Sequence, residues 1–128
     1  NRLFGTFFAG AVMALVLGLF SGRAHARPSM PDFSSKEWER TLAEMDALDF
    51  DRVMYAHNVA VGPRSSVAEQ LKYLRDLRAA VLAELKRGTP FMQVPTTVKL
   101  PQYATWDGYD EWLPMNTWRI LLEIAMGV

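Results

Sequence analysis

The stretch "SSVAEQLKYLRDLRAAVLAELKRG", residues 65–88, carries the longest regular pattern in the chain. Ser66 and Glu69 have the spacing of a capping box at a helix start, and Lys86-Arg87 followed by Gly88 is typical of a helix end. We therefore expect a helix over residues 66–87, with one face packed on a neighbour. Apolar residues recur on that face every three or four positions, at Val67, Leu71, Leu74, Leu77, Val81 and Leu85.

The segment before this helix predicts a shorter helix and a strand. Ser34 and Glu37 form another capping-box pattern, so a helix is expected over residues 35–48. Residues 53–56 are an apolar run bounded by the turn signal Gly62-Pro63, which indicates a short buried strand. The apolar face of the predicted helix consists of Trp38, Leu42, Met45 and Leu48.

The segment after the long helix predicts irregular structure and then a last helix. Residues 89–103 contain three prolines, which break regular structure. A helix is expected over residues 114–126, where the polar positions are only Asn116, Thr117, Arg119 and Glu123. A helix this apolar must be buried, either in its own core or against a partner. The candidate partner-contact residues are Trp112, Trp118, Leu121, Leu122 and Met126.

The first 27 residues predict a single transmembrane helix. No charge occurs from Leu3 to Phe20, and a helix of that length approaches the thickness of the hydrocarbon core of a bilayer. Ala24-His25-Ala26 also fits the cleavage site of a secretory signal, which is the alternative interpretation. The expected organisation is a span over residues 1–27, a linker over residues 28–34 and an α-rich domain over residues 35–128. Close packing on another membrane helix is expected at Gly5, Ala9 and Met13.

The sidedness of this span has two interpretations. Arg2 precedes the apolar run and Arg23 and Arg27 follow it, which would place the C-terminal part in the cytoplasm. The signal-like Ala24-His25-Ala26 favours export instead. We expect export, with the chain in a bacterial inner membrane and its domain in the periplasm.

Charge and composition exclude several classes of function. The net charge is zero, with +3 on residues 1–27 and −3 on the rest, where acids and bases are interleaved, so no nucleic-acid footprint is present. The chain contains no cysteine, which excludes disulfides and thiolate chemistry. The acidic group Asp107, Asp110 and Glu111 lacks the spacing of a calcium loop and is expected to be a solvated face.

Two longer stretches resemble a known family. "FSSKEWERTLAEMDALDFDRVMYAHNVAVGPRSSVAEQLKYLRDLRAAV" and "VKLPQYATWDGYDEWLPMN" are similar to the C-terminal segment of metallo-β-lactamase-fold hydrolases, particularly exported members. The resemblance covers roughly residues 33–116. It implies a helix that leads through Leu-Asp-Phe-Asp into a strand and a histidine turn, followed by Gly-Pro and a long helix.

The resemblance also implies a role for one histidine. In these hydrolases the histidine of a Gly-His-Gly turn binds zinc, and His57 matches it, with Ala56 and Asn58 in place of the glycines. The family's main ligand motif, His-x-His-x-Asp-His, has no counterpart here, where His25 is the only other histidine. A catalytic zinc needs about three protein ligands. We therefore expect no metal, no cofactor and no catalysis, with His57 holding its turn by hydrogen bonds.

These observations predict a non-catalytic function. The expected protein is mainly α with a short strand, joined to a transmembrane helix. It is a non-catalytic accessory subunit that docks on a larger bacterial membrane complex of respiratory or photosynthetic type and stabilises it, in contact with lipid and other subunits. The alternative is a zinc-dependent hydrolase remnant in which His57 completes a metallo-β-lactamase-type site with another chain.

Overall fold

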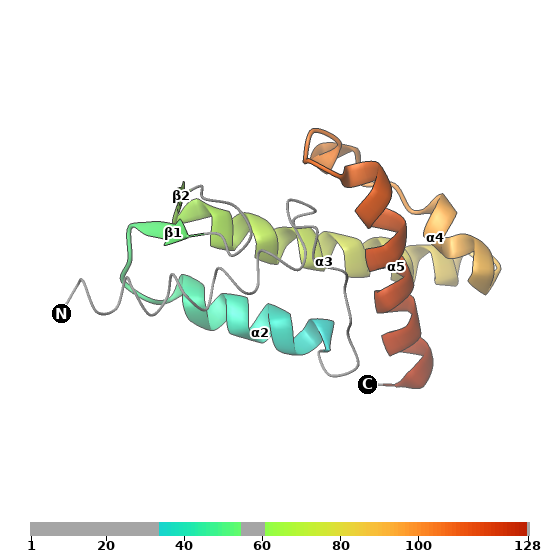
Figure 1. The fold of residues 1–128 in the computed structure, drawn as a ribbon. Helices are drawn as coiled ribbons and strands as arrows, with labels where there is room; N and C mark the ends of the chain where they lie inside the picture. The colour runs from blue at the N-terminus through green and yellow to red at the C-terminus, as the bar shows by residue number, and fades with distance from the viewer. Residues whose placement is uncertain (1–33, 55–60, 128) are drawn as a thin grey trace.

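The computed structural model describes residues 34–54 and 61–127. Over these residues the chain forms a small, mainly helical domain with two short strands, which confirms that part of the predicted fold class. The elements are α2 (Ser35–Asp46), β1 (Arg52–Met54), β2 (Val61–Pro63), α3 (Ser65–Lys86), the 3₁₀ helix η1 (Phe91–Gln93), α4 (Val94–Thr97), the 3₁₀ helix η2 (Pro101–Tyr103) and α5 (Tyr109–Met126) (Figure 1).

The long helix α3 is the centre of the domain. In Figure 1, α2 runs along one side of α3, and α5 crosses α3 towards its C-terminal end. The core lies where these three helices meet. Each fully buried aliphatic side chain there contributes about 1.5–3 kcal/mol of hydrophobic free energy. The central members are Leu42, Val67, Leu74, Leu77, Ile120 and Leu121.

The two ends of α3 differ in how well the sequence predicted them. The helix begins at Ser65, and its N-cap residue is Arg64, whose side chain makes no capping hydrogen bond, so the predicted N-cap position at Ser66 is wrong. The C-terminal end follows the prediction. Gly88 adopts φ +85°, and its N–H donates to the carbonyl of Leu85 at 3.0 Å. A left-handed residue at this place closes a helix, and glycine adopts that conformation without strain.

Helix α2 keeps its predicted start and loses its predicted end. The Ser34 hydroxyl accepts a hydrogen bond from the N–H of Lys36 at 3.2 Å, so Ser34 is the N-cap. Trp38, Leu42 and Met45 are buried as predicted. The helix ends at Asp46, two residues before the predicted end, and Leu48 is exposed while Phe50 enters the core. The apolar spacing of three and four residues therefore extends to Leu48, although the helix ends at Asp46.

The predicted strand is one half of a hairpin. β1 pairs with β2 in antiparallel register, with Val53 opposite Gly62. Gly62-Pro63, which was predicted to be a turn, lies in β2. Residues 55–56, the second half of the predicted strand, fall outside the described residues.

The region after α3 is more helical than its prolines predicted. Residues 89–103 contain the three short helices η1, α4 and η2. Helix α5 starts at Tyr109, five residues before the predicted start. Gly108, at φ +74°, is its N-cap residue, and Pro114, the predicted start, lies inside the helix. The missing N–H of Pro114 leaves the carbonyl four residues earlier, at Asp110, without its helical donor. Asp110 is exposed, so water can satisfy that carbonyl.

No helix within residues 34–54 and 61–127 is both long enough and apolar enough to cross a bilayer. The predicted span over residues 1–27, with Gly5, Ala9 and Met13, lies outside the described residues. The division into span, linker and domain therefore stays a prediction.

Candidate partner-binding surface

The outer face of α5 carries an apolar stripe, which we call the α5 stripe. Its members, spaced by three, four and four residues, share one side of the helix: Met115, Trp118, Leu122 and Met126. Trp118 and Leu122 are partly exposed, whereas Met126 is 66% exposed. The opposite side of α5 is buried against α3 and α4. Arg119, four residues after Met115 and three before Leu122, lies on the same side of the helix, where its Nε donates to Glu123.

The structure changes the predicted contact set at one position. Leu121 is completely buried in the domain's own core, so the prediction that it contacts a partner is wrong for the folded chain. Its neighbour Leu122, about 100° further round the helix, is partly exposed and stays in the set. Met115 was not predicted. It lies three residues before Trp118 on the same side of the helix and is exposed, so it joins the set. Whether Trp112, Trp118, Leu122 and Met126 contact a partner stays a prediction.

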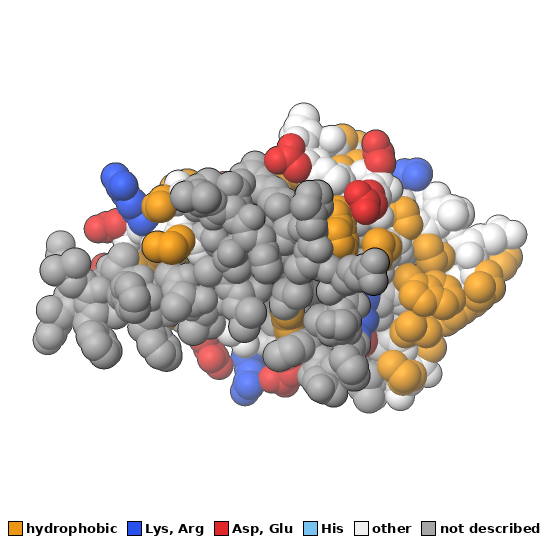
Figure 2. All heavy atoms as spheres, in the orientation of Figure 1, with side chains coloured by type: hydrophobic (Ala, Val, Ile, Leu, Met, Phe, Trp, Pro, Cys, Tyr) orange, Lys and Arg blue, Asp and Glu red, His pale blue; other side chains and the backbone are white. Residues whose placement is uncertain are grey.

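A second element extends the apolar surface beyond α5. The ring of Phe91 in η1 meets the ring of Trp118 edge to face, with centroids 5.7 Å apart. Edge-to-face pairs of this kind add about 0.5–1.5 kcal/mol beyond the area that they bury. Figure 2 shows hydrophobic side chains gathered over the α4 and α5 end of the molecule. Phe91 therefore holds Trp118 in place and joins η1 to the α5 stripe.

A buried ionic network fixes the orientation of α5. Glu123 is 1% exposed, and its carboxylate accepts hydrogen bonds from the N–H of Ser35 at 2.9 Å and from the Ser35 hydroxyl at 2.5 Å. Nε of Arg119 donates to the same carboxylate at 2.8 Å. Arg78 of α3 lies 3.8 Å from Glu123 and 3.0 Å from Glu39. A carboxylate at the N-terminus of α2 is also favoured by the helix dipole.

A cluster of aromatic rings packs the other end of α5 against α3. Tyr73, Tyr103 and Trp106 have ring centroids between 4.8 and 5.4 Å apart. The amide of Asn116 donates to the hydroxyl of Tyr73 at 2.9 Å, and the N–H of Leu100 donates to the hydroxyl of Tyr109 at 2.9 Å. Tyr73 and Tyr103 belong to the domain's own core, and Trp106 and Tyr109 pack against it.

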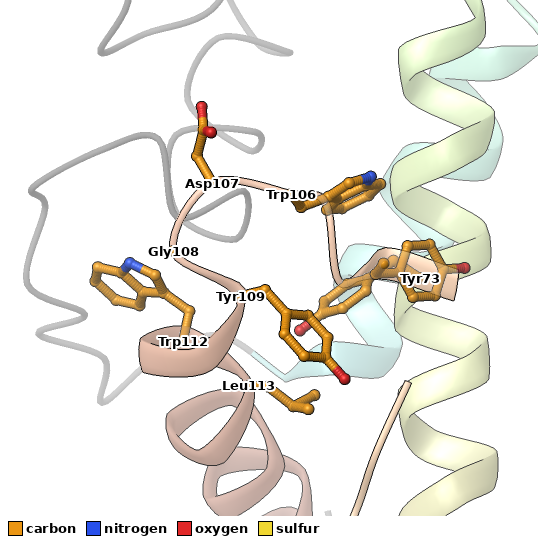
Figure 3. Close-up of a pocket in the computed structure, with 8 residues that line it drawn as sticks. Tyr73, Trp106, Asp107, Gly108, Tyr109, Trp112 and Leu113 are labelled. Atoms are coloured by element: carbon orange, nitrogen blue, oxygen red, sulfur yellow. The ribbon is translucent and has the colours of Figure 1, made fainter. Parts of the chain in front are cut away.

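The rings surround a hollow that is too small for a substrate. Figure 3 shows Tyr73, Trp106, Tyr109 and Leu113 around it, while the ring of Trp112 is directed away from Tyr73. Its cavity volume is about 10 Å³, roughly the room of one water molecule. Sites for small organic ligands measure about 300–1,000 Å³. The hollow is therefore a packing gap between rings.

Two tyrosine hydroxyls in this cluster are held in their neutral form. Burial raises the pKa of Tyr73 to about 12, against the opposing hydrogen bond from Asn116. Burial and a hydrogen bond to Asp76 raise the pKa of Tyr103 further above its ordinary value. For Asp76, burial alone would raise the pKa, but hydrogen bonds from Lys72, Tyr103 and Gln102 outweigh it and lower the net pKa.

The described residues do not fit a zinc site. No group of three potential ligands among His, Cys, Asp and Glu occurs within residues 34–54 and 61–127. His57 and His25 lie outside the described residues. The half-site alternative therefore stays a prediction. Zinc content of the purified complex, compared between the natural chain and His57→Ala, tests it.

Comparisons with known proteins leave the family open. No family model matches this chain, and no curated protein or solved structure is significantly similar to it. The resemblance to metallo-β-lactamase-fold hydrolases accordingly stays a prediction from the sequence.

Proposed function

We propose that this chain is a non-catalytic, membrane-anchored accessory subunit that binds a larger membrane complex through the α5 stripe. Residues 1–27 are the anchor, and the helical domain is the binding module. The proposed setting is a bacterial inner membrane with the domain in the periplasm, on a complex of respiratory or photosynthetic type.

The observation that carries this proposal is the apolar α5 stripe, joined to the exposed ring of Phe91. Contiguous exposed apolar surface on a soluble domain marks an interaction site. Covering it is worth up to about 2.5 kcal/mol for each 100 Å². Trp118 at its centre belongs to the residue type most enriched among dominant contacts at interfaces. The flexible side chains of Met115, Met126 and Met92 can adapt to an irregular partner surface.

The fold supports binding because it holds the stripe in one orientation before the partner arrives. Glu123 ties α5 to α2, and Asn116 ties it to Tyr73 on α3. Both polar side chains point inward, as do Ile120 and Leu121 between them, while Trp118 and Leu122 stay partly exposed. A surface that is already ordered loses less conformational entropy on association. The tight inner packing of α5 therefore favours binding by its outer face.

The predicted anchor would add to the strength of binding. A domain tethered to the same bilayer as its partner is confined to a thin layer beside the membrane. Confinement raises its effective concentration, so a modest contact through one helix face is enough for stable association.

The test is purification of the tagged full chain from its native membrane in mild detergent. We expect a defined set of subunits to accompany the natural chain and to be lost with Trp118→Asp or Leu122→Asp, since a buried unpaired carboxylate is costly. Leu48→Asp is the matched control, because Leu48 is an exposed leucine away from the α5 stripe. Helical circular dichroism confirms that each variant is folded.

Continued attachment of both stripe variants would show that another surface makes the contact. Equal release by the Leu48→Asp control would mean that any added charge disrupts the assembly, and the proposal would lose its support.

A further inference from the structure

The domain carries most of its methionines on its surface. The chain contains seven methionines and no cysteine, and five of the methionines fall within residues 34–54 and 61–127. Met45 is buried in the core at 4% exposure. The other four are half of the eight large hydrophobic side chains that are exposed in this part of the chain, namely Met54, Met92, Met115 and Met126. Their thioether sulfurs are therefore open to reagents in solution.

Three of the exposed methionines belong to the surface that is proposed to bind the partner. Met115 and Met126 are the two ends of the α5 stripe, and they are 44% and 66% exposed. Met92, at 72%, lies in η1 beside Phe91, the ring that joins η1 to the stripe. Met54, at 56%, lies apart from them in β1, near the start of α3, whereas η1 follows the end of α3 (Figure 1).

We infer that Met92, Met115 and Met126 are sites of reversible oxidation, and that their sulfoxides block docking of the α5 stripe on its partner. The inference rests on the proposed function, because it concerns the same surface. The oxidant is a peroxide. Its O–O bond breaks, one oxygen atom forms an S=O bond with the thioether, the sulfur gives up two electrons, and the other oxygen leaves as water. Sulfoxide reductases reverse the step with two electrons from a dithiol, which becomes a disulfide as water is released.

The sulfoxide opposes docking because it changes the polarity of the covered surface. A methionine thioether is apolar and flexible, whereas its sulfoxide is polar. Covering such a group without a hydrogen-bond donor from the partner raises the Kd roughly tenfold. Met45 is shielded by the core, so mild oxidation changes the surface and leaves the fold intact. A bound partner shields the stripe in the same way, so oxidation acts on the free chain.

The test oxidises the purified, tagged full chain in mild detergent with dilute hydrogen peroxide, and catalase then removes the excess. The Kd is measured for rebinding of the subunits that accompany the natural chain, supplied from its native membrane in the same detergent. Mass spectrometry of peptides reports the sulfoxide at each methionine. Circular dichroism confirms that the oxidised chain is folded.

We expect oxidation to raise the Kd of the natural chain roughly tenfold or more. Sulfoxide reductases of both stereospecificities, with dithiothreitol, should restore it. The chain with Met92→Leu, Met115→Leu and Met126→Leu should keep its Kd after peroxide, since leucine preserves the apolar volume and has no sulfur. Met54→Leu is the matched control. It removes an exposed methionine outside the binding surface, so this variant should stay as sensitive as the natural chain.

A second measurement needs no substitution. When the assembled complex is treated with peroxide, sulfoxide should form more slowly at Met115 and Met126 than it does in the free chain. Met54 should react at the same rate in both. This comparison reports directly whether the partner covers the sulfurs of the stripe.

Four results would overturn the inference. They are an unchanged Kd after oxidation of the natural chain, an equal loss of binding by the triple leucine variant, a loss that the reductases do not restore, and equal oxidation rates at Met115 and Met126 in the free and assembled chains. Leu122→Asp separates the two proposals. If it releases the subunits and peroxide does not, only the oxidation inference fails, whereas if it leaves them attached the α5 stripe is not the contact and both proposals fail.

Discussion

Glu123 near the end of α5 binds Ser35 at the start of α2, across 88 residues of sequence. Its carboxylate accepts both the backbone N–H and the hydroxyl of Ser35, at 2.9 and 2.5 Å. This contact joins the two ends of the described domain and places a negative charge at a helix N-terminus, where the macrodipole favours it. The orientation of α5, and with it the outward direction of the α5 stripe, depends on this pair.

Removing that carboxylate should destabilise the domain strongly. Glu123→Ala leaves Arg78 and the Ser35 donors without their buried acceptor, and breaking one side of a buried ion pair costs about 3–5 kcal/mol. The free energy of unfolding, measured by urea denaturation in mild detergent, is the readout. Glu44→Ala is the control, because Glu44 is an exposed acid on α2 and surface changes usually stay within about 0.5 kcal/mol. A loss below 1 kcal/mol for Glu123→Ala would show that this contact does not hold α5 in its orientation.

Two adjacent leucines should separate folding from binding. Leu121→Ala opens a cavity in the core, so it should lower the free energy of unfolding by about 2–5 kcal/mol. Leu122→Ala removes a partly exposed side chain, so it should change stability by less than about 1 kcal/mol and weaken retention of the partner subunits. Thermal unfolding and co-purification measure the two effects. The reverse assignment would mean that α5 is rotated relative to the structure.

The same pair shows what the sequence could and could not predict. Periodic apolar residues located α2 and α3 to within two residues, because each helix has one apolar and one exposed polar face. In α5 apolar residues occupy positions all round the helix from Leu113 onward, so periodicity could not tell Leu121 from Leu122. The few polar residues misled as well, since Asn116 and Glu123 point inward to Tyr73 and Ser35. Their partners lie 43 and 88 residues away, which no local pattern reveals.

Asp76 should contribute to the acid sensitivity of the domain. Its pKa in the folded state lies below the ordinary value of 3.8, because hydrogen bonds from Lys72, Tyr103 and Gln102 outweigh the effect of burial. The stabilisation is therefore present above the unfolded pKa and is lost as the pH falls through the lower folded pKa. Melting temperatures between neutral pH and pH 2 should fall less steeply for Asp76→Asn than for the natural chain. Asp51→Asn, at an exposed acid, is the control, and equal acid dependence of Asp76→Asn and the natural chain would contradict the prediction.

Tyr73 should limit stability at the alkaline side. Burial raises its folded pKa to about 12, above the ordinary value of 10.0. Its stabilisation is therefore complete below pH 10 and is lost as the pH rises from there towards 12. Ultraviolet absorbance of tyrosinate, followed with circular dichroism, should show Tyr73 ionising only with unfolding. In Tyr73→Phe the tyrosinate step that coincides with unfolding should be smaller by one residue. A natural chain that ionises all its tyrosines near pH 10 while still folded would contradict the assignment.

Gly88 should be required for its backbone conformation alone. It adopts φ +85°, and no atom lies within 4 Å of the position that a Cβ would take. Gly88→Ala therefore meets no steric clash with neighbours and should still destabilise the domain by about 1 kcal/mol, the cost of a left-handed residue with a side chain. Gly88→Asn should cost less, because asparagine tolerates this conformation better.

Gly127 provides a second position for this change, since it has φ +73° with equally open surroundings. It is the C-cap residue of α5, so Gly127→Ala should also cost about 1 kcal/mol. Urea denaturation of the three variants should show similar destabilisation by alanine at 88 and at 127, and less by asparagine at 88. If both substitutions at 88 were as stable as the natural chain, the turn after α3 could close without a left-handed residue.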